Sequence, residues 1–154
     1  MSLVEKMDAD VEIKSSAEKF HDVFSCRPHH VKNMTPDKIH GCDLHEGDFG
    51  KQGTIVNWTY THDGEKKVAK ELVEEIDDVN NSTTFKVIEG DLMKEYKLFR
   101  LTVKATAKGD GKEGSVVNWT LEYERMNHQI AQPNTLLDFL VNCTKDIDAH
   151  LQAN

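Results

Sequence analysis

Apolar and polar residues alternate strictly near the start of the chain. Between residues 7 and 13 every second residue is apolar, and the residues between them are acidic. A period of two is typical of a β-strand with one buried and one solvated face. Residues 15–18 (SSAE) then have the spacing of a capping box, which predicts that a helix starts here. Pro28 interrupts this helix, and a second short helix is expected from about Val31 to Met34.

A series of strand signals fills the middle of the chain. Val, Ile, Thr and aromatic residues are concentrated in segments that are separated by turns such as Asp63-Gly64, a hairpin signal. Because consecutive strands joined by short turns pair with each other, we predict an antiparallel sheet. In the segment 54–61 the pattern fits either register, so the face that carries Trp58 stays open. The predicted strands are 38–44, 54–61, 68–76, 83–88, 99–105 and 117–123.

The last part of the chain changes to a helical period. After Pro133, apolar residues recur at intervals of three and four, which predicts one long amphipathic helix. These residues are Leu136, Leu140, Cys143, Ile147 and Leu151, with Phe139 beside them. We therefore expect a single α+β domain, residues 1–154, in which a strongly curved sheet packs on this helix and the two short helices close one end.

Composition narrows the classes of partner. The net charge is −8, hydrophobic residues make up 38% of the chain, and charged residues make up 30%, against about a quarter in an average protein. The acidic balance disfavours nucleic acids and anionic membrane surfaces, because both attract basic faces. No apolar run approaches the roughly 18 residues of a membrane span, so no transmembrane segment is expected.

The cysteines and the first residues indicate a compartment. Cys26, Cys42 and Cys143 are widely spaced and form no CxxC pair, and acidic residues stand where a signal peptide would be hydrophobic. Free thiols are typical of a reducing compartment, so a cytoplasmic location is expected. For the oligomeric state we expect a monomer or a weak dimer.

Distinctive motifs are spread over nearly the whole chain. They are RPHHV at 27–31, TPDKIHGC at 35–42, LHEGDFG at 44–50, VIEGDLM at 87–93, WTLEYE at 119–124 and DIDAHL at 146–151. In their order and spacing they resemble the motifs of the major latex proteins, a plant branch of the Bet v 1 type, pathogenesis-related superfamily. The resemblance implies a helix-grip, START-like fold, with a curved seven-stranded antiparallel sheet around a long C-terminal helix and a large internal cavity.

The resemblance also implies a function. It points to binding of apolar or amphipathic small molecules, such as steroids, lipids, phenolics or hormones, and to roles in plant defence and stress. A carrier is the leading hypothesis, and two alternatives stay open. One is an enzyme of specialised metabolism that carries out condensation or isomerisation in the cavity, and the other is an interaction module whose acidic surface binds a partner protein. No cofactor and no set of catalytic residues is expected.

Other candidate chemistry is weaker. The glycine-rich loop 47–53 lacks the Gly-Lys-Ser/Thr start of a helix that a phosphate-binding loop needs, so we expect a structural turn. The adjacent His29 and His30 belong to no zinc-ligand spacing, and no metal site is predicted. Cys143 falls on an apolar helical stripe, where burial raises the pKa of a thiol and disfavours a nucleophile. Glu89 is the best candidate for a general acid, although it adjoins a turn-like Gly.

Side chains expected in the interior form the predicted binding site. Pattern and resemblance together place aromatic and aliphatic residues there, with Tyr60, Tyr123 and His30 as polar groups that would orient a ligand. Plain core packing is the alternative for each of them. The predicted ligand-binding residues are Phe24, His30, Tyr60, Phe85, Phe99, Leu101, Trp119, Leu121, Tyr123, Leu136, Phe139, Leu140 and Cys143.

Overall fold

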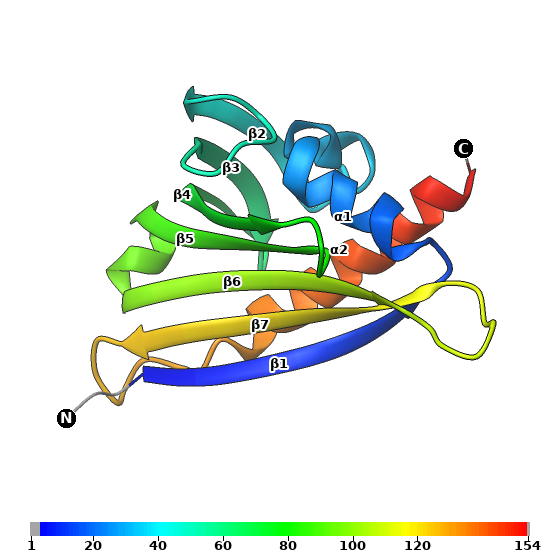
Figure 1. Cartoon of the computed structure of the whole chain (residues 1–154). Coiled ribbons are helices and arrows are strands. Elements are labelled where there is room, and N and C mark those ends of the chain that lie inside the picture. Colours follow the sequence, from blue (N-terminus) through cyan, green and yellow to red (C-terminus); the bar gives the residue numbers. More distant parts are fainter. Residues whose placement is uncertain (1–3, 154) are drawn as a thin grey trace.

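The computed structural model describes residues 4–153, and within them the chain forms seven strands, two α-helices and two short 3₁₀ helices (Figure 1). The elements in chain order are β1 (Val4–Ile13), α1 (Ala17–Cys26), η1 (Pro28–Asn33), β2 (Ile39–Glu46), β3 (Ile55–His62), β4 (Glu65–Asp77), β5 (Ser82–Gly90), η2 (Asp91–Lys94), β6 (Tyr96–Ala107), β7 (Ser115–Arg125) and α2 (Asn134–Ala153).

The strands form one antiparallel sheet. Its order is β1-β7-β6-β5-β4-β3-β2, so strands that follow each other from β2 to β7 are also neighbours in space, and β1 adds to the far edge. The sheet is strongly curved, α2 crosses its concave side, and α1 and η1 lie at one end (Figure 1). The predicted fold class, an α+β helix-grip with a curved seven-stranded sheet around the last helix, is confirmed.

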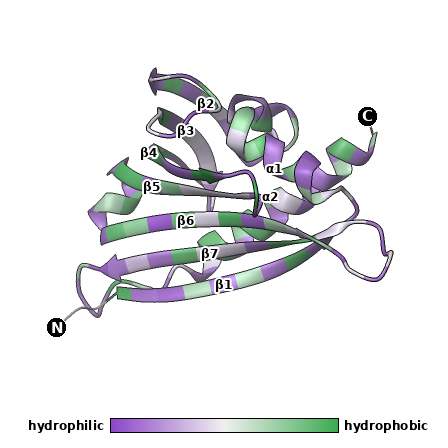
Figure 2. Cartoon of the chain, viewed as in Figure 1, coloured by the Kyte–Doolittle hydropathy of each residue, from purple (hydrophilic) through white to green (hydrophobic). Residues whose placement is uncertain are grey.

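Alternating side chains give the sheet one apolar face. In β7 every second residue from Ser115 to Tyr123 is buried, and hydrophobic and hydrophilic bands alternate along the strands (Figure 2). In β3 the buried residues include Trp58, which settles the face that the sequence left open. In β4 the buried residues include Glu71, whereas Val68 on the opposite face is 52% exposed.

The short helices differ in detail from the sequence prediction. Ser16, one residue later than the capping box requires, caps α1 and accepts the N–H of Lys19 at 3.1 Å. Ser15 instead donates its hydroxyl to Asp148 of α2 at 2.6 Å. The second helix, η1, is a 3₁₀ helix and begins earlier than predicted, at Pro28. Proline suits a first helical position because its missing N–H would have no partner there. No helix was expected at η2.

Polar contacts hold α2 in place along its length. Near its start, Thr135 forms a hydrogen bond with His62 at the end of β3, at 2.9 Å. Further along, Asp146 accepts a hydrogen bond from Lys38 at 2.7 Å. The apolar stripe of the helix, in which Ile147 is fully buried, faces the interior. The helix is therefore anchored at several points, and its apolar side is available to enclose a space against the sheet.

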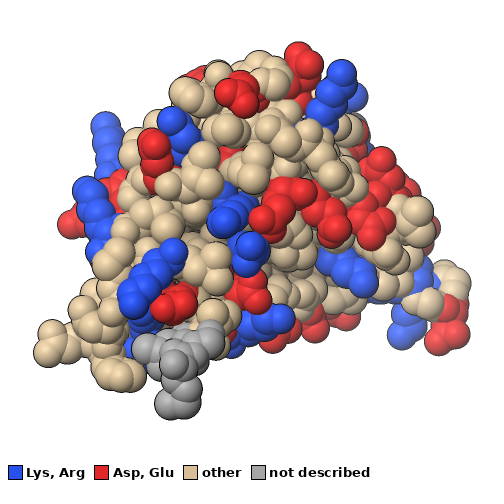
Figure 3. Space-filling model, turned by 60° about the vertical axis from the view of Figure 1, so that its left-hand side comes forward, with Lys and Arg blue, Asp and Glu red and all other residues tan. Residues whose placement is uncertain are grey.

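The surface carries charges of both signs. On the face drawn in Figure 3, Lys and Arg side chains are interspersed with Asp and Glu. Cys26, Cys42 and Cys143 are all free thiols. Across residues 4–153, none of the helices combines the length and apolar character that a membrane crossing requires.

Candidate functional site

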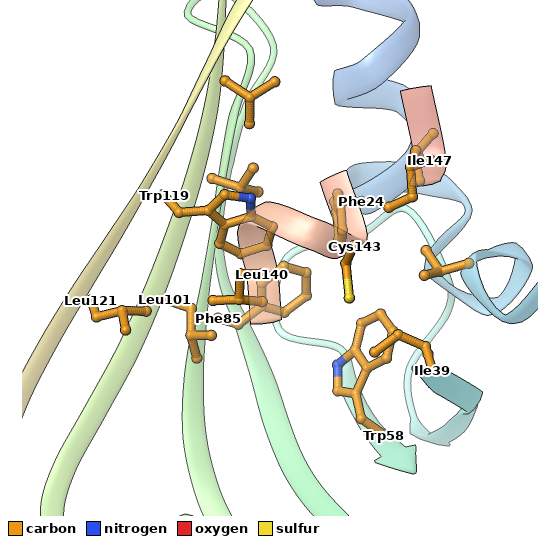
Figure 4. Packing of buried hydrophobic residues seen from close by; sticks show 14 of the residues in the cluster. Phe24, Ile39, Trp58, Phe85, Leu101, Trp119, Leu121, Leu140, Cys143 and Ile147 are labelled. Carbon is orange, nitrogen blue, oxygen red and sulfur yellow. The ribbon is translucent and has the colours of Figure 1, made fainter. Parts of the chain in front are cut away.

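An internal cavity lies between the concave face of the sheet and α2 (Figure 4). In the close-up, Trp58, Phe85 and Trp119 project from the sheet, and Leu140 and Cys143 project from the helix. Both α-helices, both 3₁₀ helices and every strand except β1 contribute to the wall. The lining residues are Phe24, Val31, Ile39, Trp58, Tyr60, Glu71, Phe85, Leu92, Leu101, Trp119, Leu136, Phe139, Leu140 and Cys143.

The cavity is narrow. The atom-free space beside the lining residues is about 600 Å³ when the part open to solvent is included, but the centre of a water molecule can reach only about 60 Å³ of it. Sites for drug-sized ligands measure roughly 300–1,000 Å³, so such a ligand requires the walls to move apart. Leu92 on η2 and Phe139 on α2 are half-buried, in contrast to the other lining residues, which are buried. The approach from solvent therefore lies beside these two side chains.

Phe24 brings α1 into the cavity wall. Its ring packs edge-on against Trp119 at a centroid distance of 5.3 Å. It also lies 6.5 Å from the rings of Trp58 and Phe85. Tilted and edge-to-face arrangements at these distances are favourable for aromatic pairs. The four rings form a stiff aromatic wall where the helix meets the sheet.

Phe139 and Tyr60 form another part of the wall, near the start of α2. Their ring centroids are 5.8 Å apart, and Phe139 also lies 5.6 Å from the imidazole of His62. Burial, together with the nearby Lys67, lowers the pKa of His62. Because His62 also holds Thr135, the first turn of α2 is fixed at the place where the cavity approaches solvent.

Glu71 is the polar exception in the lining. It is 7% exposed, and its sheet neighbours are Val56 of β3 and Val87 of β5. Burial raises the pKa of its carboxyl group to about 8, and the nearby N–H of Trp58 offsets part of this rise. Among the described residues, Trp58 Nε1 is buried without a hydrogen-bond partner. The apolar cavity thus contains a carboxyl group whose raised pKa favours the protonated form at neutral pH, and beside it an N–H donor that forms no hydrogen bond of normal geometry.

Most of the predicted binding residues lie around the cavity. They come from α1, from four strands and from one side of α2, as the alternating and helical patterns indicated. These residues are Phe24, Tyr60, Phe85, Leu101, Trp119, Leu136, Phe139, Leu140 and Cys143. Their contact with a ligand remains a prediction.

The remaining predicted residues lie elsewhere. Phe99, Leu121 and Tyr123 are almost fully buried, but they are absent from the cavity wall. Phe99 stacks on Tyr123 at 6.0 Å, and the hydroxyl of Tyr123 donates a hydrogen bond to Gln132. His30 packs on His29 in η1, at 4.3 Å, and does not line the cavity. Strand alternation predicts which face a side chain occupies, but not whether it meets a cavity or packed core.

Five lining residues were missing from the predicted set: Val31, Ile39, Trp58, Glu71 and Leu92. Val31 lies in η1 and Ile39 is the first residue of β2, and both elements are too short to show a clear period in the sequence. Leu92 lies on the unpredicted helix η2. For Glu71 a signal was present, because it shares its strand face with small apolar neighbours, but its charge favoured a solvated position.

Glu89, the best candidate for a general acid in the sequence, lies on the surface. The side chain of Glu89 is 70% exposed and pairs with Lys70 at 3.3 Å, so it does not provide the buried carboxyl group that a general acid requires. The buried acid is Glu71. Cys143 does lie in the interior, where burial raises the pKa of its thiol to about 12. Within residues 4–153 no group of His, Cys, Asp and Glu side chains is placed to hold a metal ion.

The glycine-rich loop between β2 and β3 has a structural reason for its composition. Gly47 has a φ of +91°, and a Cβ atom at this position would lie 2.8 Å from Thr54 Oγ1. The same Thr54 hydroxyl donates to the carbonyl of Asp48 at 2.6 Å and closes the loop. A side chain at residue 47 is therefore excluded by both backbone strain and space.

Comparison with known proteins gives a consistent result. Residues 2–154 match the model of the pathogenesis-related protein Bet v 1 family. The chain is 55% identical over 152 residues to MLP-like protein 43 of Arabidopsis thaliana, covering 99% of this chain and 96% of that protein. It is 57% identical to MLP-like protein 28 of the same plant over 99% of this chain, but it spans only 45% of that longer protein. The crystal structure of major latex-like protein 151 from Panax ginseng superimposes with a TM-score of 0.92 at 44% identity, covering 97% of this chain and 98% of that one.

Proposed function

The chain belongs to the pathogenesis-related Bet v 1 family, and we propose that it is a binding protein or carrier for apolar or amphipathic small molecules. The observation that supports this proposal most is the cavity between the sheet and α2, whose wall is almost entirely aromatic and aliphatic. Steroids, lipids, phenolics and hormones are the ligand classes that fit such a wall. The family's pathogenesis-related name supports a role in defence and stress, and the free thiols support a cytoplasmic location.

Binding follows from removing apolar ligand surface from water. Each Å² buried contributes about 25 cal/mol before the costs of ordering the ligand and moving the wall. Because the space is narrow, part of this free energy is used to separate the side chains around it. Phe139 and Leu92 are the natural places for this movement, since both are half-buried and have solvent beside them.

A fluorescent apolar probe tests this proposal. Titration with the uncharged dye N-phenyl-1-naphthylamine should give saturable binding of one probe per chain. Cys143→Phe places a large ring in the cavity and should abolish this binding, whereas Asn142→Phe, at an exposed position of the same helix, should leave it intact. Absence of saturable binding to the unaltered chain, or equal binding to both variants, would contradict the proposal.

Catalysis in the same cavity is a second candidate, and Glu71 is the observation that favours it. A buried carboxyl group whose pKa is raised to about 8 is suited to general acid–base work near neutral pH. Incubation of the purified protein with plant metabolite extracts, followed by mass spectrometry of the products, tests this alternative. Turnover that Glu71→Gln abolishes would support an enzyme, and unchanged extracts would leave the carrier.

A further inference from the structure

The two tryptophans of the chain differ in how their N–H groups are satisfied. Trp119 Nε1 donates a hydrogen bond to Thr144 Oγ1 of α2 at 2.8 Å. Trp58 Nε1 is also buried, yet among the described residues it forms no hydrogen bond of normal geometry, although it lies near enough to the Glu71 carboxyl group to lower the pKa of that group. Buried polar groups are nearly always paired, so an unpaired one requires an explanation. Trp58 lies in the wall of the cavity, where an incoming molecule would supply the missing partner.

Glu71 is the second polar group of this wall without an adequate partner. Within residues 4–153, the only polar group that affects its pKa is the N–H of Trp58, and no cation lies against it. Trp58 on β3 and Glu71 on β4 point into the same space from adjacent strands, because Trp58 pairs with Ala69, two residues before Glu71. If residue 71 served only the stability of the core, an apolar side chain would be favoured there, because burying a carboxyl group without partners is costly.

The other titratable groups of the cavity wall are neutral near pH 7. Cys42 on β2, behind the wall, and Tyr60 on β3 interact electrostatically with the Glu71 carboxyl group, and burial raises the pKa of both. Cys143 faces the cavity from α2, and its pKa is raised to about 12. The lining residues of α1 and β5 carry no titratable group. Glu71 is therefore the group in this wall that changes charge between pH 7 and pH 9.

Building on the proposed carrier function, we propose that Trp58 and Glu71 together recognise one hydrogen-bond-accepting oxygen of the ligand, and that the ligands are neutral carbonyl compounds with an apolar body. A protonated carboxyl group donates through its O–H, and the indole donates through its N–H. A carbonyl oxygen has two lone pairs and satisfies both donors. The remaining wall is apolar and accommodates the body of the ligand.

Charged ligands fit these two groups less well. An ammonium group would pair with ionised Glu71, but the N–H of Trp58 is a donor and cannot accept a hydrogen bond from it. A carboxylate could accept from Trp58 and from protonated Glu71, so it is disfavoured only by the loss of its own hydration. Either ion would lose its hydration in an almost entirely apolar space.

Three naphthalenes of nearly the same shape provide the test. Acetylnaphthalene has the carbonyl oxygen, isopropylnaphthalene has no polar atom, and naphthylethylamine is a cation. Dissociation constants of each are measured by intrinsic fluorescence on the full chain and on Glu71→Leu, Glu71→Gln and Trp58→Phe. Circular dichroism and thermal unfolding verify that the variants are folded. Glu71→Gln is the matched control, because its neutral amide still donates a hydrogen bond.

We expect the affinity for acetylnaphthalene, relative to isopropylnaphthalene, to fall about tenfold in Glu71→Leu and severalfold in Trp58→Phe. Glu71→Gln should retain most of this relative affinity. In the unaltered chain the relative affinity should decrease as the pH rises above about 8, where the carboxyl group loses its proton, and Glu71→Gln should show no such decrease.

Two results would overturn this inference. One is a relative affinity for the ketone that does not change in Glu71→Leu and Trp58→Phe. The other is naphthylethylamine binding more tightly than acetylnaphthalene at pH 7, with an affinity that increases with pH. If all three probes bind the unaltered chain but respond equally to every variant, the inference fails and the carrier function stands. If no probe binds, the carrier function fails as well.

Discussion

Burial of Glu71 lowers the stability of the folded protein at neutral pH. Its carboxyl group has an ordinary pKa of 4.5, which burial raises to about 8. The folded state therefore holds this proton more tightly than the unfolded state does. As the pH rises from about 4.5 to 8, the unfolded chain ionises first, so this residue progressively reduces the free energy of unfolding. Above pH 8 both states are ionised and the reduction is complete.

Replacing Glu71 should remove this dependence on pH. We expect Glu71→Gln to resemble the unaltered chain near pH 4.5 and to be more stable than it by on the order of a few kcal/mol at pH 8. Urea denaturation at a series of pH values measures the difference. Glu89→Gln, at an exposed position, is the matched control and should show no comparable trend. A constant difference between Glu71→Gln and the unaltered chain across this range would contradict the raised pKa.

The inward position of Glu71 could not be predicted from the sequence alone. In β4 both faces carry apolar residues, with Val68 and Leu72 on one and Ala69 and Val73 on the other, so alternation alone does not select the inward face. The tertiary fold makes that choice and turns Glu71 inward. In β1, by contrast, the residues between the apolar positions are acidic, so the pattern predicts clearly which face is buried.

At the level of elements, α2 is anchored to the sheet by polar contacts, and it also carries cavity-lining side chains that have to move when a ligand enters. Its register on the sheet is set by buried polar contacts, above all the bond from Trp119 Nε1 to Thr144 Oγ1. The Thr144 hydroxyl in turn donates to the carbonyl of Leu140, 2.9 Å away. This group is thus both donor and acceptor in a fully buried position.

Removal of the Thr144 hydroxyl should destabilise the protein. Thr144→Val keeps the shape of the side chain but leaves the indole N–H of Trp119 unsatisfied, and we expect a loss of about 1–3 kcal/mol in the free energy of unfolding. Thr144→Ser keeps the hydroxyl group and serves as the control. Chemical denaturation compares the two. If Thr144→Val lowers the free energy of unfolding no more than Thr144→Ser does, the hydrogen bond contributes little to stability.

Phe139 should control access to the cavity. Phe139→Ala removes a half-buried ring beside the approach from solvent, so we expect an apolar probe to associate and dissociate severalfold faster. Leu137→Ala truncates a neighbouring half-buried residue that does not line the cavity, and it should leave both rates unchanged. Stopped-flow fluorescence measures them. Equal rates in the two variants would place the entrance elsewhere.

The elements themselves were largely predictable. Alternation placed the strands and the period of three and four placed α2, because each element has one continuous apolar face. The 3₁₀ helix η2 was not predictable, since its four residues are too few to show a period. The N-cap of α1 was misplaced by one residue because two serines compete for it, and Asp148, distant in sequence, engages Ser15.

For the molecule as a whole, the motifs identified the family and the family explained the architecture. The resemblance to the major latex proteins is confirmed by the match over residues 2–154 and by the MLP-like relatives. The resemblance implied a large internal cavity, but the structure has a narrow one, in which the centre of a water molecule can reach only about 60 Å³.

An NMR spectrum of the chain with bound acetylnaphthalene tests most directly whether this interior is a binding site. Intermolecular nuclear Overhauser effects should connect the ring protons of the probe with Trp58, Phe85 and Leu140, and the amide signals near Phe139 should shift as the wall widens. Overhauser effects confined to surface residues, with interior signals unchanged at saturation, would show that the space between the sheet and α2 is core and not a binding site.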